Sequence, residues 1–156
     1  PDQAKNEIGA IMARSTTTSN YSATTQIDVK TLPNGTIAGI SAYGDNENAL
    51  GFGVQNGKLV VWKRERNNQQ TISSTDAPKS ARLYLKMTAR AGHLFRFSVS
   101  RDGKSWQNIG EEVDGAFLPP WDRGVRVALT AGGAENASAR YGFLRIEPTK
   151  QMENNK

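Results

Sequence analysis

The stretch "RLYLKMTARAGHLFRFSVSRDGKSW", residues 82 to 106, decides the fold class. Apolar residues alternate with polar ones in both of its halves, at Leu83, Leu85 and Met87 and then at Phe95, Phe97 and Val99. Alternation with a period of two puts one side of an extended strand in the core and leaves the other in water. Ala-Gly at 91 and 92 and Asp-Gly at 102 and 103 suit hairpin turns. We therefore expect antiparallel half-buried strands, with Trp106 packed just beyond the second turn.

Most of the chain shows the same pattern, with turn signals such as "PNG" at 33 to 35 and "QNGK" at 55 to 58 between the alternating segments. No stretch has sustained helical periodicity. The expected strands cover residues 7–14, 20–29, 36–43, 49–55, 58–66, 68–73, 82–90, 93–101, 105–109, 124–131 and 139–147. An all-β chain with this many short strands closes its core as a two-sheet sandwich or as a barrel.

The totals exclude several classes of protein. The chain has 156 residues, no cysteine and one histidine. Disulfides, thiol nucleophiles and zinc sites are therefore excluded, and no apolar run is long enough for a membrane helix. One domain is expected over residues 7–148, with a flexible N-terminal segment at 1–6 and a flexible polar tail at 149–156.

The net charge of +5 raises the question of a polyanionic partner. The densest basic group is "KRER" at 63 to 66, whereas the other cations are spread along strands between apolar residues. This distribution favours a solvated sheet face over a site for a polyanion, either a nucleic acid or an anionic polysaccharide.

Candidate catalytic groups are few. His93 directly follows a turn, and "GEEVDGAF" places Glu112 and Asp114 on one face of an extended segment. Glycoside hydrolysis needs two suitably placed carboxyl groups, but Phe117 stands where a glucanase-like strand has its further glutamate. The loop "YGDNENAL" at 43 to 50 offers oxygen ligands for a structural calcium ion, although EF-hand spacing is absent and an ordinary polar loop is favoured.

Several motifs in order resemble a known family. They are "AGISAYGDNENALGFGV", "GKLVVWKRE", "YLKMTARAGHLFRFSVSRDGKSWQNIG", "LPPWDRGVRVALTAGG" and "ARYGFLRI". Together they resemble the concanavalin A-like domain at the C-terminal end of family 43 β-xylosidases, over about residues 8 to 147. The resemblance implies an antiparallel jelly-roll sandwich. The alternation within its strands predicts that Ile27, Leu85, Phe97, Val127 and Leu129 face inward. It also implies a non-catalytic accessory domain of a bacterial glycoside hydrolase, with a catalytic domain or a glycan as partner and an extracellular or periplasmic location.

Sugar-binding faces use aromatic rings and planar polar groups. Trp62 with Arg64, and Tyr84 with Lys86 and Arg82, combine such groups on one side of a strand. In "LPPW" the prolines stiffen the approach to a strand, so Trp121 is either part of a binding lip or part of a structural corner. The expected carbohydrate-binding residues are Tyr43, Trp62, Arg64, Tyr84, Trp121, Asp122, Arg123 and Arg126. Two rival hypotheses are a hydrolase or lyase that uses Glu112 and Asp114, and a purely structural interaction module.

Overall fold

The computed structural model describes residues 8–150, which form eleven strands and no helix. The strands are β1 (Ala10–Ser15), β2 (Tyr21–Asp28), β3 (Ile37–Tyr43), β4 (Ala49–Gln55), β5 (Lys58–Glu65), β6 (Asn68–Asp76), β7 (Arg82–Arg90), β8 (Leu94–Ser100), β9 (Gln107–Asp114), β10 (Arg126–Gly132) and β11 (Tyr141–Pro148).

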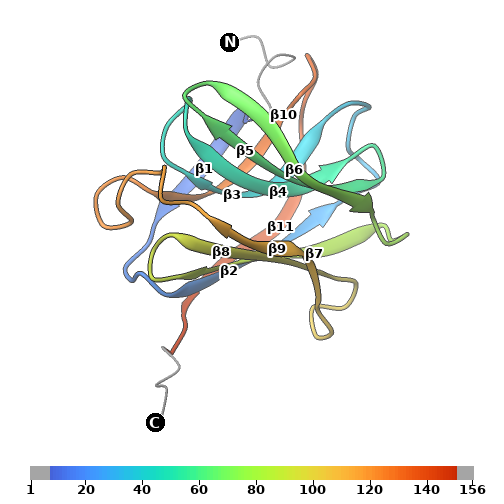
Figure 1. Ribbon diagram of the computed structural model, residues 1–156. Coiled ribbons are helices and arrows are strands. Elements are labelled where there is room, and N and C mark those ends of the chain that lie inside the picture. Colours follow the sequence, from blue (N-terminus) through green and yellow to red (C-terminus); the bar gives the residue numbers. More distant parts are fainter. Residues whose placement is uncertain (1–7, 151–156) are drawn as a thin grey trace.

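The strands form two stacked sheets, which Figure 1 shows as an upper and a lower layer. Sheet A has the order β1-β10-β3-β4-β5-β6, and sheet B has the order β11-β2-β7-β8-β9. The named strands pair with antiparallel neighbours throughout. This arrangement confirms the predicted two-sheet antiparallel sandwich. Among the described residues there is no helix long and apolar enough to cross a membrane.

The main core lies between the sheets, and all five residues predicted to face inward are in it. Ile27, Leu85, Phe97, Val127 and Leu129 are each at most 3% exposed. Strand alternation placed them correctly because the inner face of each sheet is continuous across its strands.

A second apolar cluster covers the outer face of sheet A. Its buried members are Ile8, Ile37, Ala49, Val60 and Trp62. As a result β3 and β4 are buried on both faces, which alternation in the sequence does not reveal.

Two strands extend beyond their predicted C-terminal ends by more than one residue. β6 continues to Asp76 rather than residue 73, and β9 continues to Asp114 rather than residue 109. Each has an irregularity in its pairing, and in β9 this includes Gly110 at a φ of 67°. A bulge shifts the alternation by one residue, so the sequence pattern breaks off where the strand does not.

The predicted terminal segments fall largely outside the described residues. This holds for residues 1–6 and for 151–156. At the start of the predicted C-terminal tail, the backbone N–H of Thr149 donates to the carbonyl of Asn20 at 3.0 Å.

Candidate functional site

The eight predicted binding residues lie on three separate surfaces. Tyr43, Trp62, Arg64 and Arg126 occupy β3, β5 and β10 of sheet A. Tyr84 lies on β7 of sheet B, and Trp121, Asp122 and Arg123 lie in the loop between β9 and β10. The structure therefore does not bring the predicted set together into one site.

Trp62 and Arg64 are buried, contrary to the expectation of an open face. Trp62 is 2% exposed, and its indole lies directly over Gly51 of the neighbouring strand. Arg64 is 8% exposed and donates a hydrogen bond to the side-chain oxygen of Asn67. Both residues therefore contribute to the packing of sheet A.

Tyr43 and Arg126 are direct cross-strand neighbours at the end of sheet A. The Tyr43 hydroxyl donates to Oδ1 of Asn46 at 2.7 Å. Desolvation and the nearby Asp45 raise the pKa of Tyr43, and Arg126 opposes this. The Asp45 carboxylate accepts hydrogen bonds from the N–H groups of Glu47 and Asn48, each at 2.8 Å, and so stabilises the loop that was considered for calcium.

The "LPPW" segment forms a packed corner. A Cβ atom on Gly124 would lie 2.5 Å from the Pro119 ring, and the Trp121 indole lies against Gly92 in the turn between β7 and β8. Asp122 and Arg123 remain exposed, with 3.9 Å between Arg123 Nε and Asp122 Oδ1. Of the two interpretations of this loop, its contacts favour the structural corner for Trp121.

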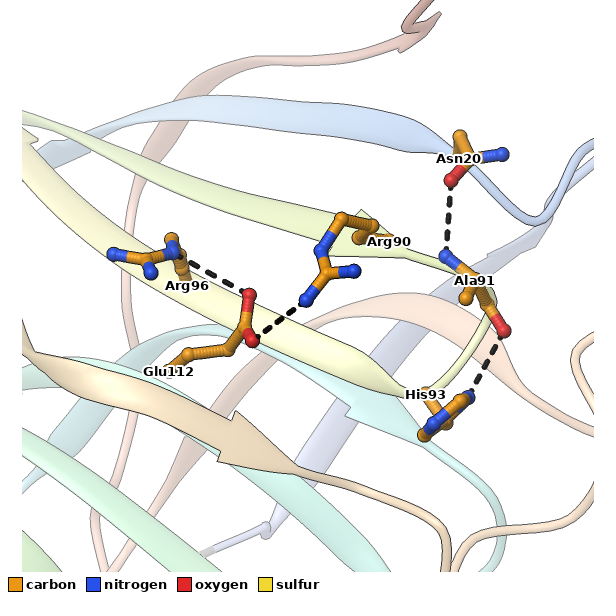
Figure 2. Close-up of polar contacts among 6 residues, drawn as sticks. All are labelled: Asn20, Arg90, Ala91, His93, Arg96 and Glu112. Carbon is orange, nitrogen blue, oxygen red and sulfur yellow. Dashed lines mark hydrogen bonds and ion pairs between the residues drawn. The ribbon is translucent and has the colours of Figure 1, made fainter. Parts of the chain in front are cut away.

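Figure 2 shows the surroundings of the candidate acid Glu112. One of its carboxylate oxygens is 2.9 Å from an Arg90 nitrogen and the other is 3.4 Å from Arg96 Nε. The hydrogen bond from Arg90 is the largest cause that lowers the pKa of Glu112 below its ordinary value. A carboxylate kept ionised by two arginines is a poor general acid.

The other groups near Glu112 hold turns in place. Asp114 accepts a hydrogen bond from the N–H of Ala116 at 2.9 Å. The side-chain oxygen of Asn20 accepts one from the N–H of Ala91 at 2.9 Å, and Nδ1 of His93 is 3.0 Å from the Ala91 carbonyl (Figure 2). These contacts explain the geometry of the hairpin without a catalytic role.

A row of aromatic side chains crosses the outer face of sheet B. Tyr84 pairs with Gln26 of β2 and with Ser100 of β8. Phe143 lies beside Tyr84 in the irregular part of β11, and Trp106 directly precedes Gln107, which pairs with Val99. The three aromatic residues are half-buried, and the Tyr84 and Phe143 ring centres are 6.2 Å apart. The row spans five strands, about 19 Å at the usual strand spacing. Its aromatic members come from alternate strands, β11 and β7, and from the residue just before β9.

A polar row lies beside the aromatic row, two residues away along each strand. It contains Arg145, Thr24, Lys86, Ser98 and Asn108. The Lys86 ammonium lies 3.7 Å from the centre of the Trp106 ring. Ser98 and Ser100 are buried, so Thr24, Lys86, Asn108 and Arg145 are the side chains of the polar row that remain accessible for hydrogen bonds. Rings beside such side chains are the combination that a pyranose chain requires, and so this face is the candidate binding site.

The face is bounded by two hollows. One of about 330 Å³ is lined by Trp106 together with Pro78, Arg101 and Asp102 among others. Another of about 310 Å³ is lined by Gln26, Asp28, Arg82, Arg140, Tyr141 and Gly142. Ser100 and Trp106 of the row line the first hollow, and Gln26 lines the second.

Sequence reasoning found half of this site. The alternation in β7 placed Tyr84, Lys86 and Arg82 on one outer face, and the structure agrees. Trp106 was expected only to pack beyond a turn, and Phe143 was not considered. Their positions depend on the register shift in β11 and on the pairing of Val99 with Gln107, which no local pattern in the sequence signals.

Comparisons with known proteins agree with this architecture. A family model described as the β-xylosidase C-terminal concanavalin A-like domain matches residues 4–147. The chain belongs to this family. No curated protein matches it.

Similar solved structures include family 43 enzymes. The GH43 protein BlXynB from Bacillus licheniformis is 25% identical with a TM-score of 0.75, over 88% of this chain and 29% of that one. A xylan β-1,4-xylosidase from Bacillus halodurans is 15% identical with a TM-score of 0.76, over 89% of this chain and 30% of that one. This chain thus spans less than a third of each enzyme.

Sheep galectin-11 in complex with glycerol is 8% identical with a TM-score of 0.56, over 89% of this chain and 97% of that one. At this identity the likeness concerns the fold alone.

Family membership confirms the expectation of a non-catalytic accessory domain, and the two arginines around Glu112 agree with it.

Proposed function

We propose that this member of the β-xylosidase C-terminal domain family binds xylan-type oligosaccharides on the outer face of sheet B and thereby assists a family 43 catalytic domain. The observation that carries the proposal is the aromatic row of Tyr84, Trp106 and Phe143 beside hydrogen-bonding side chains. A sugar ring stacked on an aromatic ring removes apolar area from water. A polysaccharide is met outside the cytoplasm, so the proposal includes an extracellular or periplasmic location.

Calorimetric titration of the chain with xylohexaose tests this proposal. Tyr84→Ala and Trp106→Ala should each weaken binding about tenfold, which corresponds to roughly 1.4 kcal/mol. Tyr43→Phe is the matched control, because Tyr43 lies on sheet A, away from the row. The melting temperature of each variant verifies that it is folded.

Two results would refute the glycan-binding proposal. One is wild-type affinity in folded Tyr84→Ala and Trp106→Ala variants. The other is failure of the wild-type chain to bind any member of a panel of neutral and acidic plant oligosaccharides. The second result would favour the structural module.

A groove between β1, β10 and the segment that precedes β11 favours a second function, which is contact with the catalytic domain. Its volume is about 370 Å³, and its lining includes Met12, Leu129, Ala137 and Ala139. Met12 is 57% exposed. An exposed apolar surface of this kind is typical of protein contacts.

The second function is tested with a family 43 catalytic domain prepared without its own C-terminal domain. Sedimentation velocity should show a complex with the wild-type chain and a weaker one with Met12→Glu. If Met12→Glu binds as well as the wild-type chain, this groove is not the contact surface.

A further inference from the structure

Lys86 differs from Arg90, Arg96 and Arg145, three other cations on the outer face of sheet B. Arg90 and Arg96 contact Glu112, and Arg145 Nε lies 3.9 Å from Glu147. Lys86 has no carboxylate within ion-pair distance in residues 8–150, and its ammonium is placed instead over the Trp106 ring.

The surroundings of Lys86 are poorly solvated. Desolvation is the main cause that lowers the pKa of Lys86, and the more distant charge of Glu147 opposes it. A partly desolvated ammonium over an aromatic ring gains more from an arriving anion than a fully hydrated one does. The half-buried position also leaves room for a ligand, because Lys86 remains partly exposed.

The hollow beside Trp106 carries further charges. Arg101 and Asp102 both contribute to its lining. Oδ1 of Asp102 accepts hydrogen bonds from the N–H groups of Lys104 at 2.8 Å and Ser105 at 2.9 Å, which are the largest causes that lower the pKa of Asp102 to about 2. Asp102 is thus committed to its own turn, while Arg101 and Lys104 are exposed cations around it.

We propose that Lys86 and Trp106 form a subsite for a carboxylate-bearing sugar, a uronic acid unit attached to a β-linked oligosaccharide that lies along the aromatic row. This inference rests on the proposed glycan binding. The sugar ring packs beside Trp106, and its carboxylate pairs with the Lys86 ammonium. A single ammonium suits one carboxylate, whereas a nucleic acid requires several phosphate contacts, and Arg90, Arg96 and Arg145 already contact carboxylates.

The test compares two ligands that differ in one group. Calorimetric titration at low salt uses a xylotetraose that carries one glucuronic acid branch and the same compound with its carboxyl group reduced to an alcohol. The wild-type chain should bind the acidic compound about tenfold more tightly, and 0.5 M NaCl should remove most of that preference.

Lys86→Met retains an apolar stem beside Trp106 without the charge. It should bind both compounds with the affinity that the wild-type chain has for the reduced one. Lys58→Met is the matched control, since Lys58 is a paired lysine on sheet A, 2.9 Å from Asp76, and it should retain the preference. The indole N–H signal of Trp106 in NMR spectra should shift on titration with the acidic compound in the wild-type chain.

The outcomes separate the two proposals. Equal wild-type affinity for the acidic and reduced compounds would overturn the subsite and leave glycan binding intact. An unchanged preference in folded Lys86→Met would also overturn the subsite. Absence of binding to either compound would refute glycan binding, and the subsite with it. If Lys86→Met does not fold, an unchanged preference of the wild-type chain in 0.5 M NaCl would overturn the subsite.

Discussion

The indole of Trp62 lies over Gly51, on the face of sheet A that points away from the main core. A Cβ atom on Gly51 would overlap the Cε2 and Cζ2 atoms of this ring. The glycine thus creates the space in which the largest side chain of the second cluster is buried. This relationship explains why Trp62 is inaccessible although its strand alternates in the expected way.

Substitutions at this contact should reduce stability. We expect Gly51→Ala to lower the free energy of unfolding by about 1–3 kcal/mol through overpacking. Trp62→Ala should lower it by about 3–5 kcal/mol through lost burial and a cavity. Urea titration measures both values.

Gly142→Ala is the control for these substitutions. A Cβ atom there would meet the flexible Oε1 end of Gln26, at 2.5 Å, rather than a buried ring. A loss at Gly142 as large as that at Gly51 would contradict the role assigned to the Trp62 contact.

Tyr141 connects the two sheets. From β11 of sheet B its hydroxyl lies 2.6 Å from the carbonyl oxygen of Thr130 and 3.0 Å from that of Gly39, both in sheet A, and its one proton is shared between them. Tyr141→Phe should therefore lower the free energy of unfolding by about 1 kcal/mol. Thermal or urea unfolding measures this loss, and an unchanged stability would show that these hydrogen bonds contribute nothing net.

Tyr21 should respond to the same substitution in the opposite way. It is 1% exposed, and its hydroxyl has no hydrogen-bond partner in the part of the chain that the structure describes. A buried hydroxyl without a partner costs free energy, so Tyr21→Phe should be neutral or should stabilise the domain by up to about 1 kcal/mol. A clear loss on urea unfolding would reveal a partner for this hydroxyl.

The sequence predicts the sandwich well because its core depends on a simple alternation. The correct inward placement of Leu85 and Phe97 and the outward placement of Tyr84 and Lys86 all follow from that period of two. For Trp62 the alternation gives the correct face of the sheet. It does not show that a second cluster covers that face, because such cover comes from distant parts of the chain.

The aromatic row depends on features that are not local. Tyr141 and Phe143 have the same spacing as two residues on one face of a regular strand. The register shift between Tyr141 and Leu144 instead leaves Tyr141 bonded to sheet A and Phe143 beside Tyr84 on the outer face. Trp106 joins the row because Gln107 pairs with Val99, which is a long-range register. Irregular pairing and register cannot be predicted from periodicity.

Glu112 should affect acid stability and not catalysis. Because its pKa is lowered in the folded state, its contribution is present above the unfolded pKa of about 4.3 and is lost as the pH falls through the folded value. Glu112→Gln should therefore reduce the melting temperature at pH 7 and have a smaller effect near pH 2.

The control for Glu112→Gln is Glu111→Gln, because the exposed Glu111 has no ion-pair partner among the described residues. The wild-type chain should not hydrolyse aryl xylosides. Turnover that is abolished by Glu112→Gln would restore the hydrolase hypothesis.

At alkaline pH, Tyr21 and Tyr141 should both lower the free energy of unfolding. Desolvation is the main cause that raises the pKa of both Tyr21 and Tyr141, so that the folded state keeps their protons when the unfolded chain loses them above about pH 10. Each tyrosine should then remove about 1.4 kcal/mol per pH unit from the free energy of unfolding, from the unfolded pKa upward until the folded group ionises. In the Tyr21→Phe/Tyr141→Phe double variant this part of the slope is absent, while every other titratable side chain is the same in the two proteins. Urea unfolding of both proteins from pH 8 to 11.5 should give a constant difference in stability below pH 10 that then shifts in favour of the double variant. Parallel curves over the whole range would show that the two hydroxyls ionise as readily in the folded domain as in the unfolded chain.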